Sequence, residues 1–160
     1  MSQERASDAK FNLYNSFCVE EVSEAFNRRL DRFLALMLFV LGASIIATFT
    51  SRTVVGLMVA IISGLQVTYK FGEKAGKSKS QKLRYAELMS MCDSMTEKAL
   101  STKLATASKS DSSVPGWMRA VGHKKACIML GEDTDVILTR WQCLLGTISG
   151  AGPLSSQTAA

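Results

Sequence analysis

The sequence predicts an all-α membrane protein, in which a two-helix transmembrane hairpin carries long cytosolic helical extensions and a C-terminal helical pair. The first observation behind this prediction is a pair of uncharged apolar runs, residues 33–49 and 53–69. The second is the clustering of basic residues just before and just after these runs. The third is the helical periodicity of the rest of the chain. Because this remainder is polar, the hydrophobic content of the 160-residue chain is an ordinary 47%.

Residues 1–32 are predicted to form an amphipathic cytosolic helix. Between residues 8 and 32, apolar side chains such as Phe11, Cys18 and Val22 recur at helical spacing. The opposite face, which we expect to be solvated, carries Glu20, Glu21 and Glu24. No Pro or Gly occurs before Gly42, so this helix is predicted to run directly into the first apolar run.

The two apolar runs, residues 33–49 and 53–69, are predicted to be membrane spans. Seventeen helical residues cover ~25 Å, close to the ~30 Å hydrocarbon core of a bilayer. Neither run holds a charge, so each needs an apolar environment on every side. A chain of this length has little material with which to wrap two such helices. A soluble helical protein that hides the hairpin in a bundle or an oligomer is the alternative, because runs just under eighteen residues are ambiguous.

Basic residues flank the hairpin and set its predicted orientation. We call them the basic collar: Arg28, Arg29, Arg32, Lys70, Lys74, Lys77, Lys79, Lys82 and Arg84. Lys and Arg accumulate on the cytoplasmic side of membranes, so we expect both termini in the cytoplasm and a short external turn near residues 50–52 of a protein of the cytoplasmic (inner) membrane. The collar is expected to attract anionic lipid headgroups. It lacks interleaved aromatic residues, so no nucleic-acid partner is expected.

Small residues within the two runs recur at four-residue intervals, which places them on one face of each helix. They are Ala43 and Ala47 in the first run and Gly56, Ala60 and Gly64 in the second. Such faces let helix backbones approach closely in lipid. The pattern predicts helix packing, either between the two spans or between copies in a homo-oligomer.

Residues 70–104 are predicted to continue as a basic, heptad-like cytosolic helix that Gly72 and Gly76 weaken without stopping. Its apolar positions, which step by three and four residues, are Tyr85, Leu88, Cys92, Met95 and Ala99. This seam is expected to pack on the N-terminal helix. The Ser-, Thr- and Lys-rich stretch that ends at Pro115 predicts a linker over residues 105–115.

Residues 116–149 are predicted to form a pair of shorter helices, followed by a flexible tail over residues 150–160. The first helix covers about 117–130, and Asp133 or Thr134 is the expected N-cap of the second. One face of the second helix carries Ile137, Trp141, Leu144, Leu145 and Ile148. Trp141 is expected to contribute to cytosolic packing. Arg140 argues against a third span, so this helix is predicted to be docked or interfacial.

No motif for catalysis, a cofactor or a metal is found in the sequence. The four cysteines, Cys18, Cys92, Cys127 and Cys143, have no zinc-ligand spacing and are expected to be reduced and buried. The single histidine, His123, has no nearby cysteine. We therefore expect a protein without cofactor and without enzymatic activity. We also expect no secretory signal, because the first apolar run follows some thirty polar residues.

The chain resembles the SLATT family of two-transmembrane bacterial proteins over roughly residues 15–145. The likeness lies in a polar helix ending in Arg28-Arg29-Leu30, an apolar hairpin, and the stretch FGEKAGKSKSQKLRYAEL with Phe71, Ala75, Tyr85 and Leu88. The resemblance implies a membrane effector of a bacterial conflict system that oligomerises into a pore when a sensor is triggered. This chain has no recognisable sensor domain of its own, so the resemblance implies a separate sensor or regulatory protein.

Two functions therefore fit the sequence. The first is a pore-forming or membrane-disrupting effector, a class that includes holin-like phage proteins. The second is a non-pore membrane adaptor or structural subunit whose cytosolic helices recruit a partner. The lack of polar pore-lining residues within the two apolar runs favours the second.

Overall fold

The structure is a computed structural model that describes residues 2–46, 52–132 and 136–151, with side chains for 8–43, 53–132 and 136–151. Every regular element in these ranges is a helix, and they contain no strand. The predicted all-α class is confirmed.

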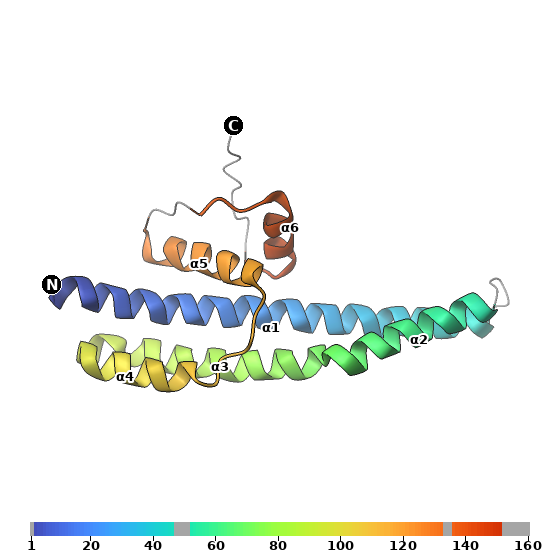
Figure 1. Cartoon of the computed structure of the whole chain (residues 1–160), viewed down its shortest axis with the longest axis horizontal. Coiled ribbons are helices and arrows are strands. Elements are labelled where there is room, and N and C mark those ends of the chain that lie inside the picture. Colours follow the sequence, from blue (N-terminus) through green and yellow to red (C-terminus); the bar gives the residue numbers. More distant parts are fainter. Residues whose placement is uncertain (1, 47–51, 133–135, 152–160) are drawn as a thin grey trace.

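The longest element is α1, a continuous helix of 45 residues, Ser2–Ile46. It runs the length of the molecule, and the other helices lie along it (Figure 1). The predicted passage of the N-terminal amphipathic helix into the first apolar run is confirmed. The sequence allows this because no helix breaker occurs before Gly42.

The chain returns along α1 as two helices, α2 (Arg52–Tyr69) and α3 (Phe71–Met91). Our expectation that nothing stops the helix after the second run was wrong, because Lys70 adopts a left-handed conformation with φ 46° and ψ 52°. The Lys70 amide still donates to the Gln66 carbonyl at 3.0 Å. The break changes the direction of the chain, so that α2 and α3 follow α1 at different angles (Figure 1).

The predicted heptad seam holds for its first three positions only. Tyr85, Leu88 and Cys92 are buried, as expected of a seam that packs on α1. Met95 is half-buried and Ala99 is exposed, because a 3-10 turn (Cys92–Ser94) and extended backbone at Met95 reverse the chain. Helix α4 (Glu97–Ser108) then runs back beside α3 (Figure 1).

The linker predicted over residues 105–115 begins too early, because residues 105–108 belong to α4. Leu104 and Ala107 pack against the core formed around Leu13 and Tyr85, which holds this part of the chain as a helix. The hydroxyls of Thr102 and other Ser and Thr residues donate to carbonyls one turn earlier and so do not compete with the helix.

The C-terminal pair consists of α5 (Gly116–Leu130) and α6 (Arg140–Ile148). The first agrees with its prediction within one residue. The expected N-caps of the second, residues 133 and 134, lie outside the described residues, and α6 begins only after Thr139. There the Gln142 side chain accepts hydrogen bonds from the Thr139 amide at 2.8 Å and from its hydroxyl at 3.0 Å. Trp141 is 74% exposed, so its predicted role in cytosolic packing was wrong.

Helix α1 is covered on two sides, by α3 and α4 and by α5 (Figure 1). One core cluster lies around Leu13 and Tyr85, and a second lies around Val22 and Val121. For this reason the prediction that Glu20, Glu21 and Glu24 lie on a solvated face was wrong: Glu20 and Glu24 are buried, and Glu21 is half-buried.

Candidate functional site: the apolar arm and its basic collar

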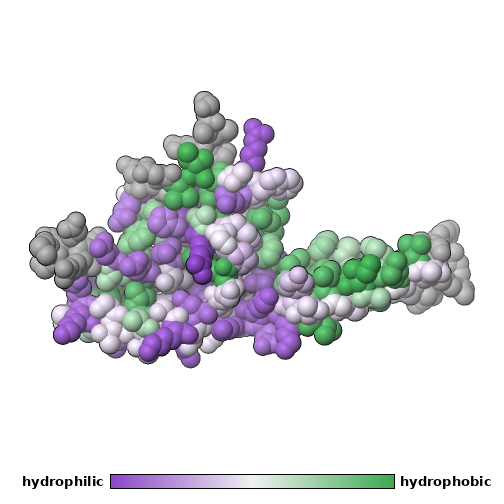
Figure 2. Space-filling model, in the orientation of Figure 1, coloured by the Kyte–Doolittle hydropathy of each residue, from purple (hydrophilic) through white to green (hydrophobic). Residues whose placement is uncertain are grey.

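The molecule has two regions with different surfaces. We call residues 33–46 of α1 together with α2 the arm, and residues 8–32 of α1 together with α3 to α6 the head. Figure 2 shows a slender hydrophobic projection next to a broad body of mixed polarity, with strongly hydrophilic residues where the two meet. The arm is hydrophobic along most of its described length in this view.

Large apolar side chains of the arm are exposed instead of forming a core. Phe39 is 75% exposed and Val67 is 74% exposed. Other exposed side chains of the arm are Phe33, Leu36, Val40, Val54, Leu57, Met58, Ile61, Leu65 and Tyr69. Among its described residues only Val55 is buried. Soluble proteins commonly expose single hydrophobic side chains, but they rarely expose a contiguous apolar patch of this extent.

The head does not enclose the arm, so the alternative in which the chain's own helices wrap the hairpin is wrong. One helix of the described chain, Thr53–Ser94 taken across the bend at Lys70, is long and apolar enough to cross a membrane, and only 6% of its apolar window is buried. The described part of the first run ends at Ile46, fourteen residues after Arg32, and residues 47–49 lie outside the described ranges. That the first run, residues 33–49, also spans a membrane therefore stays a prediction.

Helix α2 uses one face against α1 and leaves its small residues on another. Its least exposed side chains, Val55, Val59, Ile62 and Gln66, follow three- and four-residue steps. The predicted helix-packing residues Gly56, Ala60 and Gly64 are all exposed, as is Ala43 of α1. A Cβ atom added at Gly56 or Gly64 would meet no atom within 4 Å. Ala47 lies outside the described residues.

Part of the basic collar lies at the base of the arm. Arg32, Lys70 and Lys74 are exposed there, and Lys74 places its Nζ atom 5.5 Å from the centre of the Tyr69 ring. The Lys70 ammonium lies 3.2 Å from a carboxylate oxygen of Glu73. Two arginines contact the head instead, since Arg28 pairs with Glu24 and Arg29 donates to the Ile148 carbonyl.

The rest of the collar follows α3 away from the arm. At 1.5 Å per residue, Lys79 lies ~15 Å and Arg84 ~22 Å beyond the end of α2, whereas a headgroup layer is only ~5–8 Å thick. Lys82 pairs with the buried Glu24, and Arg84 donates to the Gln81 side chain at 3.1 Å. The structure therefore separates the nine collar residues into a group at the arm base, which includes the exposed Lys77, and a group within the head.

A buried polar network within the head was not anticipated. The Tyr85 hydroxyl and the Gln81 amide both donate to Asp111, and the Ser112 amide donates to the Glu20 carboxylate at 3.0 Å. The second Glu20 oxygen has no partner in the structure. Burial, reinforced by the charge of Asp111, raises the pKa of Glu20. Polar residues at three- and four-residue steps from Glu20 to Asn27 were the available sequence signal.

The thiols are all free, and three of them are buried. Burial raises the pKa of Cys18 to about 12, so this sulfur remains a thiol and lies 3.5 Å from the Met129 sulfur. In the described part of the chain, no three His, Cys, Asp or Glu side chains are grouped closely enough to hold a metal ion.

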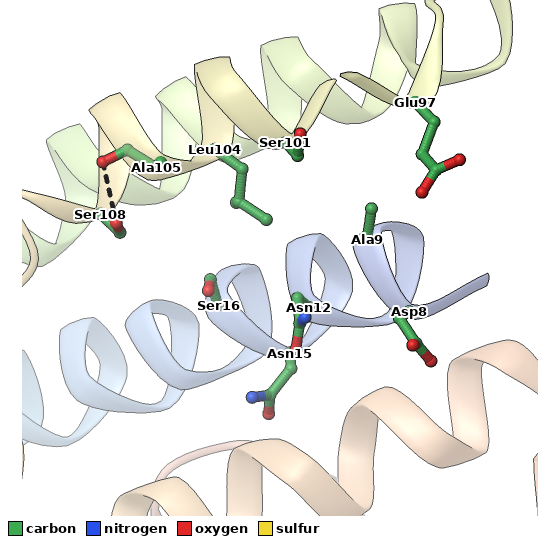
Figure 3. A pocket seen from close by; sticks show the side chains of 10 residues that line it. All are labelled: Asp8, Ala9, Asn12, Asn15, Ser16, Glu97, Ser101, Leu104, Ala105 and Ser108. Atoms are coloured by element: carbon green, nitrogen blue, oxygen red, sulfur yellow. Dashed lines mark hydrogen bonds between the residues drawn. The ribbon is translucent and has the colours of Figure 1, made fainter. Parts of the chain in front are cut away.

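A groove of about 490 Å³ lies between α1 and α4 (Figure 3). Ala9, Leu104 and Ala105 supply its apolar part, while Asn12, Ser101 and other amide or hydroxyl side chains line the rest. Asp8 and Glu97 lie at one end of the groove, and none of the residues that line it is basic.

Comparisons of the chain with protein-family models, with curated proteins and with solved structures find no match.

Proposed function

We propose that this chain is an oligomeric, two-span integral protein of a bacterial or phage-infected cell's cytoplasmic membrane, with the arm in the bilayer and the head and both termini in the cytoplasm. The observation that supports this most is the exposure of eleven large apolar side chains on the arm, from 42% to 75% each. Transferring such a side chain fully from water stabilises by about 1.5–3 kcal/mol. Transfer of the arm out of water is therefore strongly favourable, and the helices of the head do not bury it.

The insertion is tested by alkaline carbonate extraction of membranes from cells that express the full chain. We expect the protein to stay in the membrane pellet. Release into the supernatant would overturn the proposal and favour a soluble oligomer that hides its arms.

Orientation is tested by thiol labelling of intact cells with a membrane-impermeant maleimide. Cysteine introduced by Ser51→Cys, between the spans, is expected to react in intact cells. Cysteine introduced by Ser90→Cys, at an exposed position of α3, is expected to react only after lysis. The reverse pattern would place the head outside.

For its activity we propose membrane disruption by an oligomeric pore, as the likeness to the SLATT family implies. Two spans of one copy cannot enclose a channel, so a pore requires several copies. The exposed small-residue face of α2 supports such association, because it is free of α1 and lets helices approach closely.

The pore is tested by membrane potential and viability during regulated expression. We expect depolarisation by the wild-type chain and its loss in the Gly56→Leu/Gly64→Leu variant, with Val67→Leu as a matched control on another exposed position of α2. Both variants should remain in the carbonate pellet. If high levels of wild-type protein leave potential and viability unchanged, the pore function is wrong. A closed ring of many subunits in detergent would agree with it.

The second candidate is a non-pore membrane adaptor, which the groove between α1 and α4 favours. Its acidic end, formed by Asp8 and Glu97, suits a partner segment that carries Lys or Arg, such as a separate regulatory protein. Dye leakage from liposomes that contain only the purified chain would count against this candidate. Liposomes that retain their dye, together with a monomeric or dimeric state of the protein, would support it.

A further inference from the structure

A cavity of about 430 Å³ lies at the junction of head and arm, where α1, the start of α3 and the segment before α5 meet. Three aromatic side chains line it, Phe26, Tyr69 and Phe71, of which the last two stack with ring centres 5.5 Å apart. The charged side chains that line it are Lys74 and Lys77, and no acidic side chain lines it. The cavity therefore combines positive charge with an aromatic wall.

The two lysines lack the ion pairs that some other collar residues form. Lys70 has Glu73 as an ion-pair partner, and Arg28 and Lys82 share Glu24. Lys74 places its ammonium over the ring face of Tyr69, and neither Lys74 nor Lys77 forms an ion pair with a carboxylate of the described residues. Their charges are thus left for a ligand to neutralise.

The end of the cavity at Lys74 lies at the height of the headgroup layer of a bilayer that holds the arm. Lys74 lies ~7.5 Å beyond the end of α2 along the helix, and Lys77 lies ~12 Å beyond it, one helical turn closer to the head. Headgroups occupy ~5–8 Å outside the hydrocarbon core. Amphipathic aromatic rings such as that of Tyr69 favour this same depth.

The remaining polar lining suits an oxyanion. Ser112 and Ser113 are among the residues that line the cavity. A phosphate accepts hydrogen bonds from ammonium and hydroxyl groups at once, and its contacts with charged donors are the stronger ones. Lysine binds phosphate as a point charge and needs no fixed fork geometry.

We infer that this cavity binds a phosphate group, that of an anionic lipid headgroup, through Lys74 and Lys77. The aromatic wall receives the glycerol and the first acyl carbons. This inference rests on the proposed function, because a lipid reaches the cavity only when the arm lies in the bilayer. It narrows the predicted lipid contact from the nine residues of the basic collar to one cavity that two lysines line.

The test is native mass spectrometry of the full chain in detergent, titrated with phosphatidylglycerol and, separately, with phosphatidylcholine. We expect the wild-type chain to bind phosphatidylglycerol at least tenfold more tightly. The Lys74→Gln/Lys77→Gln variant should lose about thirty-fold in phosphatidylglycerol affinity, from about 1 kcal/mol for each charge near an anionic partner. The matched control is Lys98→Gln/Lys103→Gln, which removes two exposed charges from α4 and should bind as the wild type does.

Inorganic phosphate at millimolar concentration separates the two sources of a phosphate group. If it fails to displace the bound lipid, the headgroup is the ligand. Displacement would reassign the cavity to a soluble phosphate compound and overturn the lipid assignment. Equal binding of both lipids by the wild-type chain, or an equal loss in the control, would also overturn the inference.

Carbonate extraction of the same variants distinguishes this inference from the proposed function. If all variants stay in the membrane pellet and no lipid preference is found, only the cavity assignment fails. If the wild-type chain is released, the membrane function itself fails.

Discussion

The head and the arm share one helix, α1, but its side chains are mostly buried or half-buried in the head and mostly exposed in the arm. In the head, α1 is covered from two sides and buries even Glu20 and Glu24. In the arm, the same helix exposes Phe33, Leu36 and Phe39. The head exposes apolar side chains such as Ile137 and Trp141 among charged residues, whereas the arm is apolar all round and holds no charge between Arg32 and Arg52. Exposure therefore has a different meaning in each region if the arm lies in the bilayer, as we propose.

The strongest test of this difference between arm and head places the same charge on an exposed apolar position of each region. Ile61 in the arm is 51% exposed and Leu83 in the head is 58% exposed. A lysine at the centre of a membrane span costs about 2.5–3.5 kcal/mol. We expect Ile61→Lys to lower the carbonate-resistant fraction strongly and Leu83→Lys to leave it unchanged. Equal behaviour of the two variants would mean that the arm stands in water.

The glycines of the two regions provide the next comparison. A Cβ atom at Gly122 in the head would lie 2.5 Å from Val19 Cγ2 and 2.9 Å from its backbone, because α5 crosses α1 closely there. A Cβ atom at Gly64 in the arm would meet nothing within 4 Å. Gly122→Ala is expected to destabilise the head by about 2–3 kcal/mol, whereas Gly64→Ala should be neutral or gain up to ~1 kcal/mol in helix propensity.

These stabilities are measured by chemical unfolding of the full chain in detergent micelles, monitored by tryptophan fluorescence. Trp117 reports on the head, because its ring packs edge-on against Phe26 with centroids 5.0 Å apart. An unchanged midpoint for Gly122→Ala would show that α1 and α5 can move apart without cost.

The buried Glu20 predicts how the stability of the head depends on pH. Because burial and the nearby Asp111 raise its pKa in the folded state, the folded chain binds this proton more tightly than the unfolded chain does. Acidification therefore stabilises the head through this group, and stability falls as the pH rises from the ordinary carboxyl pKa through the raised one.

Glu20→Gln removes this charge and keeps an oxygen that can accept from the Ser112 amide. We expect a gain on the order of 1 kcal/mol at neutral pH and a flatter pH profile of the unfolding midpoint. Glu97→Gln, at a half-buried position of α4, is the control. A profile that is unchanged in Glu20→Gln would contradict the prediction.

The arm and the head also differ in how far the sequence alone predicted them. The two apolar runs and the uninterrupted α1 were predictable, because composition and the absence of breakers act locally. The burial of Glu20 and Glu24 was not, because α1 is covered on a second side by α5, a segment that follows some ninety residues later. Periodicity identifies an apolar stripe but does not show how many neighbours a helix has.

The turn after Cys92 and the cavity at the arm base were missed for a related reason. The steps from Tyr85 to Ala99 fit one straight helix as well as two that fold back, and only packing of Leu100 against the core decides between them. The cavity combines Phe26, Tyr69 and Met118, which are far apart in sequence. The basic collar was predictable as a composition, but its division between the arm base and the head depends on distances along α3.

The smallest expected effect concerns the residue at which arm and head meet. Lys70 has a left-handed backbone, which costs an L-residue roughly 1–2 kcal/mol and glycine little. We compare Lys70→Gly with Lys70→Ala, since both remove the same charge and the same exposed ion pair with Glu73. With the bend present, the glycine variant should be the more stable by about 1 kcal/mol in the fluorescence assay. If α2 and α3 instead formed one straight helix, the order would reverse, because alanine exceeds glycine by a similar amount within a helix. The sign of this difference thus reports directly whether the chain changes direction as it passes from the arm to the head.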